Sequence, residues 1–289
     1  MLRKVLSLAA VIGALAAPAA FAETTQQETP IQSWSFNGPL GMYDQEQLQR
    51  GFKVYEQVCS ACHSINYIHF YNLGEPGGPF WSDNPKYADH PNDNPWVKAI
   101  AAGWPRPVPM INPDTGDETH RPAATSDVLV GPFANDAAAR GSNGGALPPD
   151  MSLLVNAREG GPNYVAAVAG FNGPAPAGLD VPPGKYYNPF VPGDVSGSWH
   201  GDPTKVPPGS FISMPPPLTD CKVTFDDGKP CKTADEARDV SAFLQWAADP
   251  KMNERKQLGA AVMVYLGIFS VLLYLSYRAI WRNIEHLGV

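Results

Sequence analysis

Two long apolar stretches lie near the ends of the chain, and the first has the pattern of an export signal. Arg3 and Lys4 precede an apolar run over residues 5–17, and residues 20–22, Ala-Phe-Ala, form a small-residue cleavage site. The pattern predicts a signal peptide over residues 1–22 that is removed on export. A membrane anchor is disfavoured because the run is shorter than the roughly 20 residues that a span requires.

The second stretch, residues 258–277, contains no charged residue and predicts a transmembrane helix about 30 Å long. Basic residues flank both of its ends, so the orientation follows from export of the preceding chain. We therefore expect a single-pass protein of the bacterial inner membrane, in contact with membrane lipid through this helix. Residues 23–257 would form a periplasmic domain, and residues 278–289 a cytoplasmic tail.

Between these stretches, the apolar positions predict a first amphipathic helix that begins at Asp44. Asp44 with Gln47 resembles a capping box at the start of a helix. Gly51 lies inside this helix, where glycine costs about 1 kcal/mol relative to alanine, so we expect another element to approach closely there. The apolar positions that share one helical face are Leu48, Phe52, Tyr55 and Cys59.

A second amphipathic helix is predicted to begin at Thr233, with Glu236 completing a capping box, and to end at Asp249, before Pro250. Its broad apolar face leads us to expect that it crosses the first helix near Gly51. A third, shorter helix is predicted over residues 149–157. The apolar stripe of the second helix consists of Ala237, Val240, Leu244 and Ala247.

The rest of the chain is characterised by its high proline and glycine content. The 31 prolines and 27 glycines are concentrated in residues 72–132 and 172–217, which we expect to be ordered loops. The fold class is therefore mainly α with extensive Pro/Gly-rich loops, in one domain. The formal charge of −7 becomes −9 without Arg3 and Lys4, which argues against nucleic acid as a partner and favours a basic one.

Two of the four cysteines, Cys221 and Cys231, flank the segment KVTFDDGKP. Asp227-Gly228 within this segment is a good turn signal, and the residues on either side favour short strands. In the oxidising compartment that the signal peptide implies, we expect a hairpin with a disulfide across its open end.

The other two cysteines belong to Cys59-Ser60-Ala61-Cys62-His63, a pattern typical of covalent haem attachment. The two thiols add to the vinyl groups of the porphyrin, and the adjacent imidazole binds the iron. A redox-active dithiol would favour a βαβ setting, and a zinc site would need a second ligand pair. The sequence offers neither, so it predicts one haem c, bound through Cys59 and Cys62 with His63 as an axial ligand.

The second axial ligand decides whether such a haem transfers electrons or binds a small molecule. Met110 and Met214 lie in Pro-stiffened loops, whereas Met151 in the predicted third helix is better suited to core packing. The pattern favours Met214 only modestly, because it lies just before the last periplasmic helix. Histidine ligation is a weaker alternative, offered by His69, His90, His120 and His200.

Several stretches resemble the cytochrome c1 family, the haem-bearing subunits of the cytochrome bc1 complex, in order and spacing. They are residues 48–67, 132–165, 186–190, 214–218 and 223–250, together with the terminal span. The resemblance implies a class I cytochrome c-like haem domain with one C-terminal transmembrane helix. It does not extend to residues 68–131, and the cysteine pair at 221 and 231 departs from the family pattern.

The resemblance also implies roles for individual residues. Met214, in its Met-Pro-Pro setting, would be the second iron ligand, opposite His63. No catalytic residue is expected. The remaining haem contacts that it implies are Arg158 and Tyr164 at the propionates, and Asn143 and Pro149 lining the haem crevice.

The implied function is electron transfer within quinol–cytochrome c reductase, with no independent catalysis by this chain. The haem would accept an electron from the Rieske iron–sulfur protein and pass it to a soluble cytochrome c. Cytochrome b would be a further partner, and the whole complex a homodimer. The alternatives are a membrane-anchored haem peroxidase or gas sensor, and a cytochrome subunit of another membrane oxidoreductase. Acidic residues that could attract a basic cytochrome are Asp83, Asp89, Asp93, Asp226, Asp227 and Glu236.

Overall fold

The computed structural model describes residues 25–285, so the predicted signal peptide and the last four residues lie outside it. The described part is mainly helical, with long irregular connections, which confirms the predicted fold class. Three short antiparallel sheets pair β1 with β4, β2 with β3, and β5 with β6. The helices are α2 (Gln45–Gln57), α3 (Pro95–Ala102), α4 (Asp136–Ser142), α5 (Pro162–Gly170), α6 (Thr233–Ala248) and α7 (Met252–Glu285). The strands are β1 (Ile65–His69), β2 (Val108–Ile111), β3 (Glu118–Arg121), β4 (Val128–Leu129), β5 (Tyr186–Asn188) and β6 (Ser210–Ile212).

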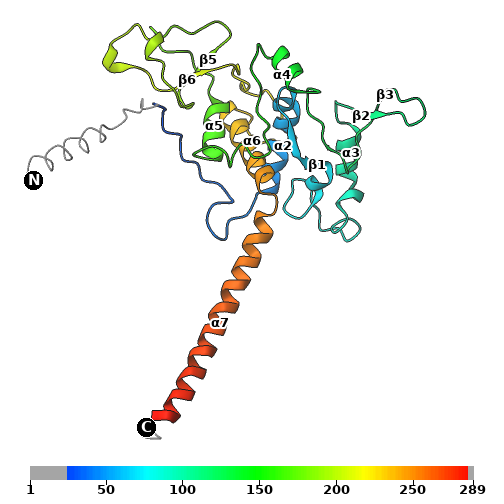
Figure 1. Cartoon of the computed structure of the whole chain (residues 1–289), viewed down its shortest axis with the longest axis vertical. Coiled ribbons are helices and arrows are strands. Elements are labelled where there is room, and N and C mark those ends of the chain that lie inside the picture. Colours follow the sequence, from blue (N-terminus) through cyan, green and yellow to red (C-terminus); the bar gives the residue numbers. More distant parts are fainter. Residues whose placement is uncertain (1–24, 286–289) are drawn as a thin grey trace, which may run out of the picture.

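The core forms where α2 packs against α6, and α5 covers α6 from another side (Figure 1). The predicted crossing at Gly51 is confirmed. A β-carbon added there would overlap the backbone carbonyl of Asp239 and lie 2.7 Å from Cβ of Phe243. The missing side chain therefore lets the two helix backbones touch. The predicted stripe of α2 is buried, at Leu48, Phe52 and Tyr55.

The starts of these two helices differ in how they are capped. The Asp44 carboxylate accepts from the backbone N–H groups of Glu46 and Gln47, as predicted for the N-cap of α2. The capping box predicted at the start of α6 is wrong, because Glu236 accepts instead from the backbone N–H of Val223, at 2.7 Å. Asp220 supplies the cap, accepting from the backbone N–H and hydroxyl of Thr233.

The prediction of a third helix over residues 149–157 is wrong: residues 149 and 150 have no regular structure, and residues 151–157 form a bend and a series of turns. Their backbone donors are drawn to other partners, since Met151 N–H donates to the carbonyl of Ser64 and Ser152 N–H donates to the Asp150 carboxylate. In a helix, the later backbone N–H groups of the segment would instead donate to earlier carbonyls of the same segment. The hydrogen bonds that attach this segment to the chain after Cys62 therefore outweigh its local helical pattern.

The hairpin predicted between Cys221 and Cys231 is also not formed as strands, although Gly228 makes the expected turn with φ +69°. The structure joins the two cysteines in a disulfide, with their Cα atoms 4.5 Å apart. The loop between them is tied to α2, because Lys53 pairs with Asp226 and Arg50 with Asp227. Attachment to α2 replaces pairing within the loop. We call residues 221–231 the disulfide loop.

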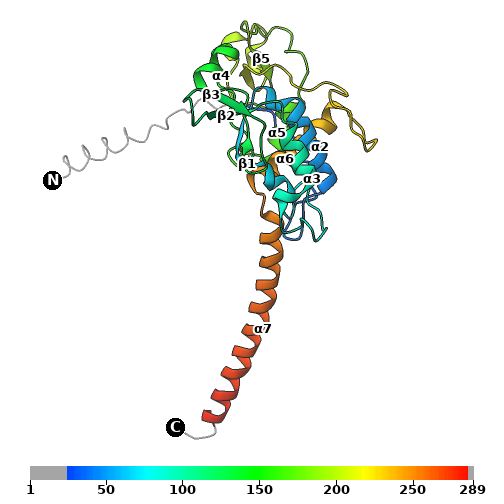
Figure 2. The same cartoon turned by 90° about the vertical axis from the view of Figure 1, so that its right-hand side faces the viewer.

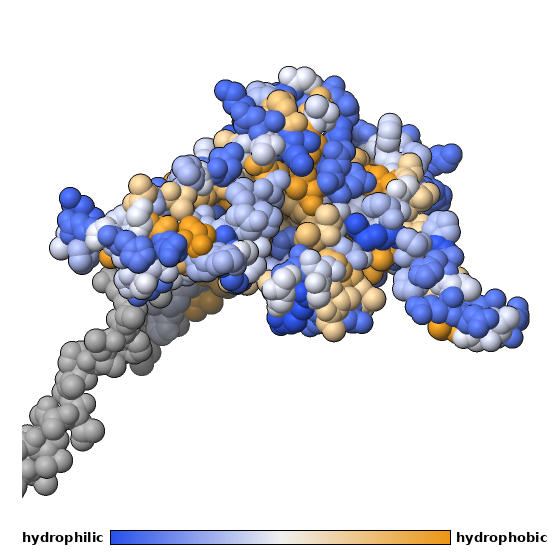
Figure 3. All heavy atoms as spheres, turned by 90° about the horizontal axis from the view of Figure 1, so that it is seen from above, coloured by the Kyte–Doolittle hydropathy of each residue, from blue (hydrophilic) through white to orange (hydrophobic). Residues whose placement is uncertain are grey.

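The predicted loop regions contain more regular structure than their composition suggests. Helix α3 was not predicted, although Asn94 caps it through Trp96 N–H and Pro95 occupies its first turn, both recognisable start signals. Strands β2 and β3 form an arm that projects from the domain and is mostly hydrophilic (Figures 1 and 3). Strands β5 and β6 pair within the second predicted loop region.

Helix α7 leaves the domain as one continuous helix and points away from it in both views (Figures 1 and 2). Within the described residues, Met252–Arg282 is the one segment long and apolar enough to cross a membrane, and its apolar window is not buried by the rest of the chain. This agrees with a single C-terminal membrane anchor. The boundaries proposed at residues 258 and 277 lie inside the helix and stay predictions.

Candidate functional site

The motif Cys59-Ser60-Ala61-Cys62-His63 lies directly after the end of α2. Val58 ends the helix, and a 3-10 turn over Cys59–Ala61 follows it. Backbone N–H groups of Cys62 and His63 both donate to the carbonyl of Cys59, at 3.1 and 2.9 Å. The turn thereby gathers the two thiols and the imidazole at one end of a buried helix, which restricts their motion.

His63 is held in one orientation by a partner distant in sequence. Its Nδ1 lies 2.8 Å from the backbone carbonyl oxygen of Pro149, and the side chain is 8% exposed. A carbonyl can only accept, so Nδ1 carries the proton and Nε2 keeps its lone pair. Burial lowers the pKa of His63, which favours the neutral imidazole. A neutral ring with a free Nε2 is the form that binds a metal.

Asp150 fixes the segment that presents the Pro149 carbonyl. Its carboxylate accepts from Ser64 Oγ at 2.8 Å, from Asn66 N–H at 2.9 Å and from Ser152 N–H at 2.8 Å. Burial alone would raise the pKa of Asp150, but these hydrogen bonds lower it below its usual value. The charged carboxylate thus ties residues 149–152 to the chain that follows His63.

The two thiols do not form a site that favours dithiol or zinc chemistry. Cys59 is partly buried and Cys62 is exposed. Burial, with a smaller contribution from Cys62, raises the pKa of Cys59 to about 12, whereas redox-active thiols have a lowered pKa and lie at helix N-termini. Among residues 25–285, no three His, Cys, Asp or Glu side chains are arranged to hold a metal ion.

Arg158 and Tyr164, the residues implied for the propionates, are brought close together. Tyr164 is partly buried against the core, and burial raises the pKa of its hydroxyl. The positive charge of the nearby Arg158 guanidinium opposes this shift. Arg158 is otherwise exposed. A cation and a phenol side by side can together receive a carboxylate.

The three candidate methionines have different surroundings. Met110 lies on β2 in the projecting arm and is 39% exposed, whereas Met151 is buried and adjoins Ser64, next to His63. Met214 is half-buried and lies two residues after the end of β6. Three prolines and the buried Leu218 follow it and limit the freedom of its backbone.

Asn143 ends α4 and donates from its side chain to the carbonyl of Ala139, at 2.7 Å. The hydrogen bonds of the described residues connect His63 with Pro149, but none connects Asn143 or Met214 to that pair. The placement of Asn143 and Met214 at the haem therefore stays a prediction. Sequence reasoning assigned Pro149 to the crevice lining and missed that its carbonyl orients His63.

The prediction that Glu236 helps to attract a partner is wrong. Glu236 is fully buried and bonded to the disulfide loop, so it cannot meet another protein. Asp226 and Asp227 are exposed but paired with basic residues of α2, and Asp93 is paired with Lys98. Asp83 and Asp89 are exposed.

The motif lies on the side of the domain away from the membrane anchor. The N-terminal end of α2 adjoins the first turn of α7, where Tyr43 N–H donates to Asn253 at 3.1 Å. The 13 residues of α2 then extend about 20 Å toward the opposite side, near α4 (Figure 1). Seen from that side, apolar surface gathers over the centre of the domain, between the polar arm and the polar loops (Figure 3). Two thiols, an oriented imidazole and apolar surface together fit a covalent haem.

Comparison with known proteins agrees with this arrangement. The Cytochrome C1 family matches residues 34–284. Cytochrome c1 of Rhodospirillum rubrum is 38% identical over 271 residues, covering 88% of each chain, and that of Blastochloris viridis is 37% identical over 304 residues, covering 98% of this chain and 97% of its own. A protein named cytochrome b/c1 from Bradyrhizobium diazoefficiens is 38% identical over 88% of this chain, which spans only 36% of that longer protein. The chain belongs to the cytochrome c1 family.

Proposed function

We propose that this chain is the haem subunit of a cytochrome bc1 complex and holds one haem c through thioether bonds to Cys59 and Cys62. The observation that carries the proposal is the hydrogen bond between His63 Nδ1 and the Pro149 carbonyl, at 2.8 Å. It leaves Nε2 of a buried, neutral imidazole available as a ligand beside two thiols. When bound, the haem supplies a one-electron redox couple.

The residues of the chain tune and shield this couple. His63 and Met214 would occupy both axial positions, which closes the iron to substrates, and thioether ligation favours a high reduction potential. Arg158 with Tyr164 would neutralise a propionate, and Asn143 would line the crevice. The buried backbone around His63 favours the less charged reduced state.

The route of the electron is proposed from the orientation of the domain. An electron would arrive from the Rieske iron–sulfur protein and leave to a soluble cytochrome c. The motif lies about 20 Å, the length of α2, from the start of the anchor, which supports access for a soluble protein. The exposed carboxylates of Asp83 and Asp89 and the net negative charge would steer a basic acceptor toward the domain.

The partners and location follow from the anchor and from one relative. The name of the Bradyrhizobium relative joins cytochrome b and c1 in one protein, which supports cytochrome b as a neighbour of this chain. We propose a homodimeric multi-subunit complex in the bacterial inner membrane. The signal peptide over residues 1–22 would be removed, the haem domain would be periplasmic, and residues 278–289 would be cytoplasmic.

A haem stain of the membrane fraction, followed by identification of the co-purified subunits, tests the proposal. We expect a stained band at the size of the processed chain, a cytochrome b, an iron–sulfur protein, and electron transfer from quinol to soluble cytochrome c. The variant Cys59→Ser/Cys62→Ser should lose the covalent stain, and Cys221→Ser/Cys231→Ser should keep it. Cyanide binding by the resting haem would favour the peroxidase or gas-sensor alternative. A different set of co-purified subunits would favour another membrane oxidoreductase.

A further inference from the structure

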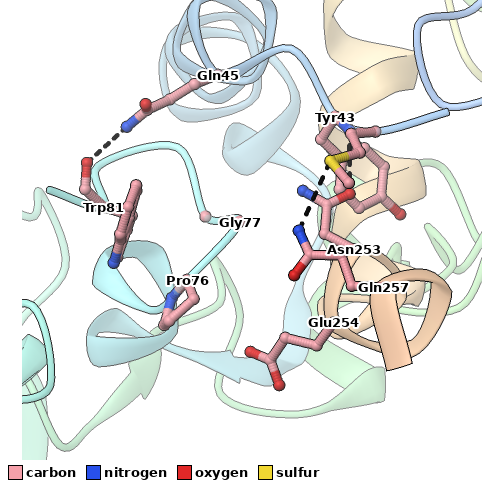
Figure 4. A pocket seen from close by; sticks show the side chains of 10 residues that line it. Tyr43, Gln45, Pro76, Gly77, Trp81, Asn253, Glu254 and Gln257 are labelled. Carbon is pink, nitrogen blue, oxygen red and sulfur yellow. Dashed lines mark hydrogen bonds between the residues drawn. The ribbon is translucent and has the colours of Figure 1, made fainter. Parts of the chain in front are cut away.

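A cavity of about 370 Å³ lies where the globular domain meets α7. Figure 4 shows Pro76, Gly77 and Trp81 on one side, facing Asn253, Glu254 and Gln257 of α7 across an open space. We propose that this cavity binds the headgroup of a phospholipid that carries a primary ammonium, an ethanolamine phospholipid. The inference rests on the membrane anchor and is independent of the haem assignment.

The position of the cavity along α7 determines which molecules can reach it. Gln257 lines the cavity and directly precedes Leu258, where the uncharged, exposed stretch of α7 begins. Asn253 lies four residues earlier, about 6 Å along the helix axis. The headgroup layer on each side of a bilayer is roughly 5 to 8 Å thick. The cavity therefore lies at the depth of the lipid headgroups.

Two donors in the wall lack acceptors. Nε1 of Trp81 is buried and has no hydrogen-bond partner among the described residues. Asn253 uses its carbonyl oxygen to accept from Tyr43 N–H, at 3.1 Å, and no described residue accepts from its amide nitrogen. The Trp81 nitrogen is a buried donor without an acceptor, which is unfavourable, so an acceptor from outside the chain would stabilise this side of the wall. The oxygens of a phosphodiester are strong acceptors and suit both groups.

Acceptors lie on the α7 side of the cavity. One carboxylate oxygen of Glu254 accepts from Lys251 Nζ, at 3.1 Å, and the other has no bonded partner among the described residues. Lys251 Nζ also lies 3.6 Å from the carboxylate of Glu75, so one ammonium is shared by two carboxylates. Together, these three side chains carry a net charge of about −1. A cationic ligand is therefore favoured here.

The pairing of donors and acceptors selects among lipids. A primary ammonium offers three N–H donors to Glu254 and to the side-chain carbonyl of Gln257, whereas a quaternary choline offers none. An anionic glycerol headgroup would add a second negative charge beside Glu254 and be repelled. Apolar atoms of Met42, Pro76 and Trp81 line the remaining wall and suit the glycerol region.

Native mass spectrometry of the full chain, purified with its accompanying subunits, tests the proposal. The delipidated protein is mixed with equal amounts of ethanolamine, choline and glycerol phospholipids, and retained lipid is counted. We expect the wild type to retain one ethanolamine lipid. Glu254→Gln should reduce the preference for ethanolamine over choline about tenfold, and Trp81→Phe should reduce retention of both about tenfold, as for loss of one hydrogen bond to a charged group. The matched controls are Glu159→Gln and Trp96→Phe, both at exposed positions.

Three results would overturn the inference. They are a wild type that retains no lipid because another subunit fills the cavity, equal retention of glycerol and ethanolamine lipids, and wild-type retention and selectivity in both cavity variants. Unfolding midpoints equal to that of the wild type show that a loss of lipid is not a loss of folding. If Trp81→Phe lowers the midpoint, Glu254→Gln decides, because its change in selectivity does not follow from instability.

Discussion

His63 Nδ1 and the backbone carbonyl oxygen of Pro149 are 2.8 Å apart, although 86 residues separate them in sequence. This bond determines which imidazole nitrogen carries the proton, and so which nitrogen is free to bind iron. The turns over residues 151–157, within the segment 149–157 for which the sequence predicts a helix, hold the carbonyl in place. A helix would have directed these backbone groups to one another instead of to His63.

The assignment of Met214 as second iron ligand predicts the effect of Met214→Leu. Leucine retains the volume but cannot bind iron, so the covalent haem should remain while its reduction potential falls by on the order of 0.1 V or more. Quinol-dependent reduction of cytochrome c should fall with it. A redox titration of the haem absorption band measures the change. Met110→Leu, in the exposed arm, is the matched control, and a potential unchanged in Met214→Leu would refute the assignment.

Removal of the Asp150 carboxylate should destabilise the segment that presents the Pro149 carbonyl to His63. Asp150→Ala loses three charge-assisted hydrogen bonds and leaves the Ser64 hydroxyl and two backbone donors without that acceptor. We expect the free energy of unfolding to fall by about 2 to 3 kcal/mol, measured by guanidinium denaturation. Asp194→Ala, which loses only local bonds to Ser196 at an exposed turn, should cost clearly less stability than Asp150→Ala. Equal losses in the two variants would contradict the proposed role.

The same carboxylate predicts part of the acid sensitivity. Its folded pKa lies below the ordinary value of 3.8, so its contribution to stability is present above that value and is lost as pH falls through the folded pKa. Unfolding midpoints measured between pH 7 and pH 2.5 should therefore fall less steeply below about pH 4 in Asp150→Asn than in the wild type. Parallel curves would show that Asp150 does not titrate with folding.

Gly51 and Gly141 should respond to alanine in opposite directions. A β-carbon at Gly51 would overlap the Asp239 carbonyl and approach Phe243, so Gly51→Ala should separate α2 from α6 and cost about 1 to 3 kcal/mol or more. Gly141 lies in α4 with no atom within 4 Å of an added β-carbon. Gly141→Ala should therefore stabilise the protein by about 0.5 to 1 kcal/mol. Thermal unfolding of both variants measures the contrast, and equal effects would show that the helices do not touch there.

The disulfide should stabilise the chain without affecting haem attachment. Cys221 and Cys231 are 10 residues apart, so Cys221→Ser/Cys231→Ser should lower the free energy of unfolding by about 2 to 3 kcal/mol by the chain-entropy model. A mild thiol reductant should lower the stability of the wild type by a similar amount and leave that of the double variant unchanged. Denaturation curves with and without reductant provide the comparison. Sensitivity of the double variant to reductant would point to a different bond.

Sequence patterns that span only a few residues determine several structural features of this protein. The Cys59-Ser60-Ala61-Cys62-His63 motif, the stripes of α2 and α6 and the uncharged stretch of α7 each express a local periodicity or spacing, which needs no knowledge of distant residues. Gly51 was interpreted correctly for the same reason, because glycine inside a strong helical pattern indicates close approach. Helix α3 had local start signals of this kind that its proline-rich surroundings concealed.

Tertiary structure decided what depends on partners far apart in sequence. Glu236 matched a capping box, yet it is buried against Val223, and residues 149–157 matched a helix, yet Asp150 ties them to Ser64. In each case a charged side chain accepts a hydrogen bond from a residue distant in sequence, and that bond outweighs the local pattern. Sequence alone could propose candidate residues for binding a haem, but only the folded chain brings the Pro149 carbonyl to His63, because that bond joins segments with no periodic relation.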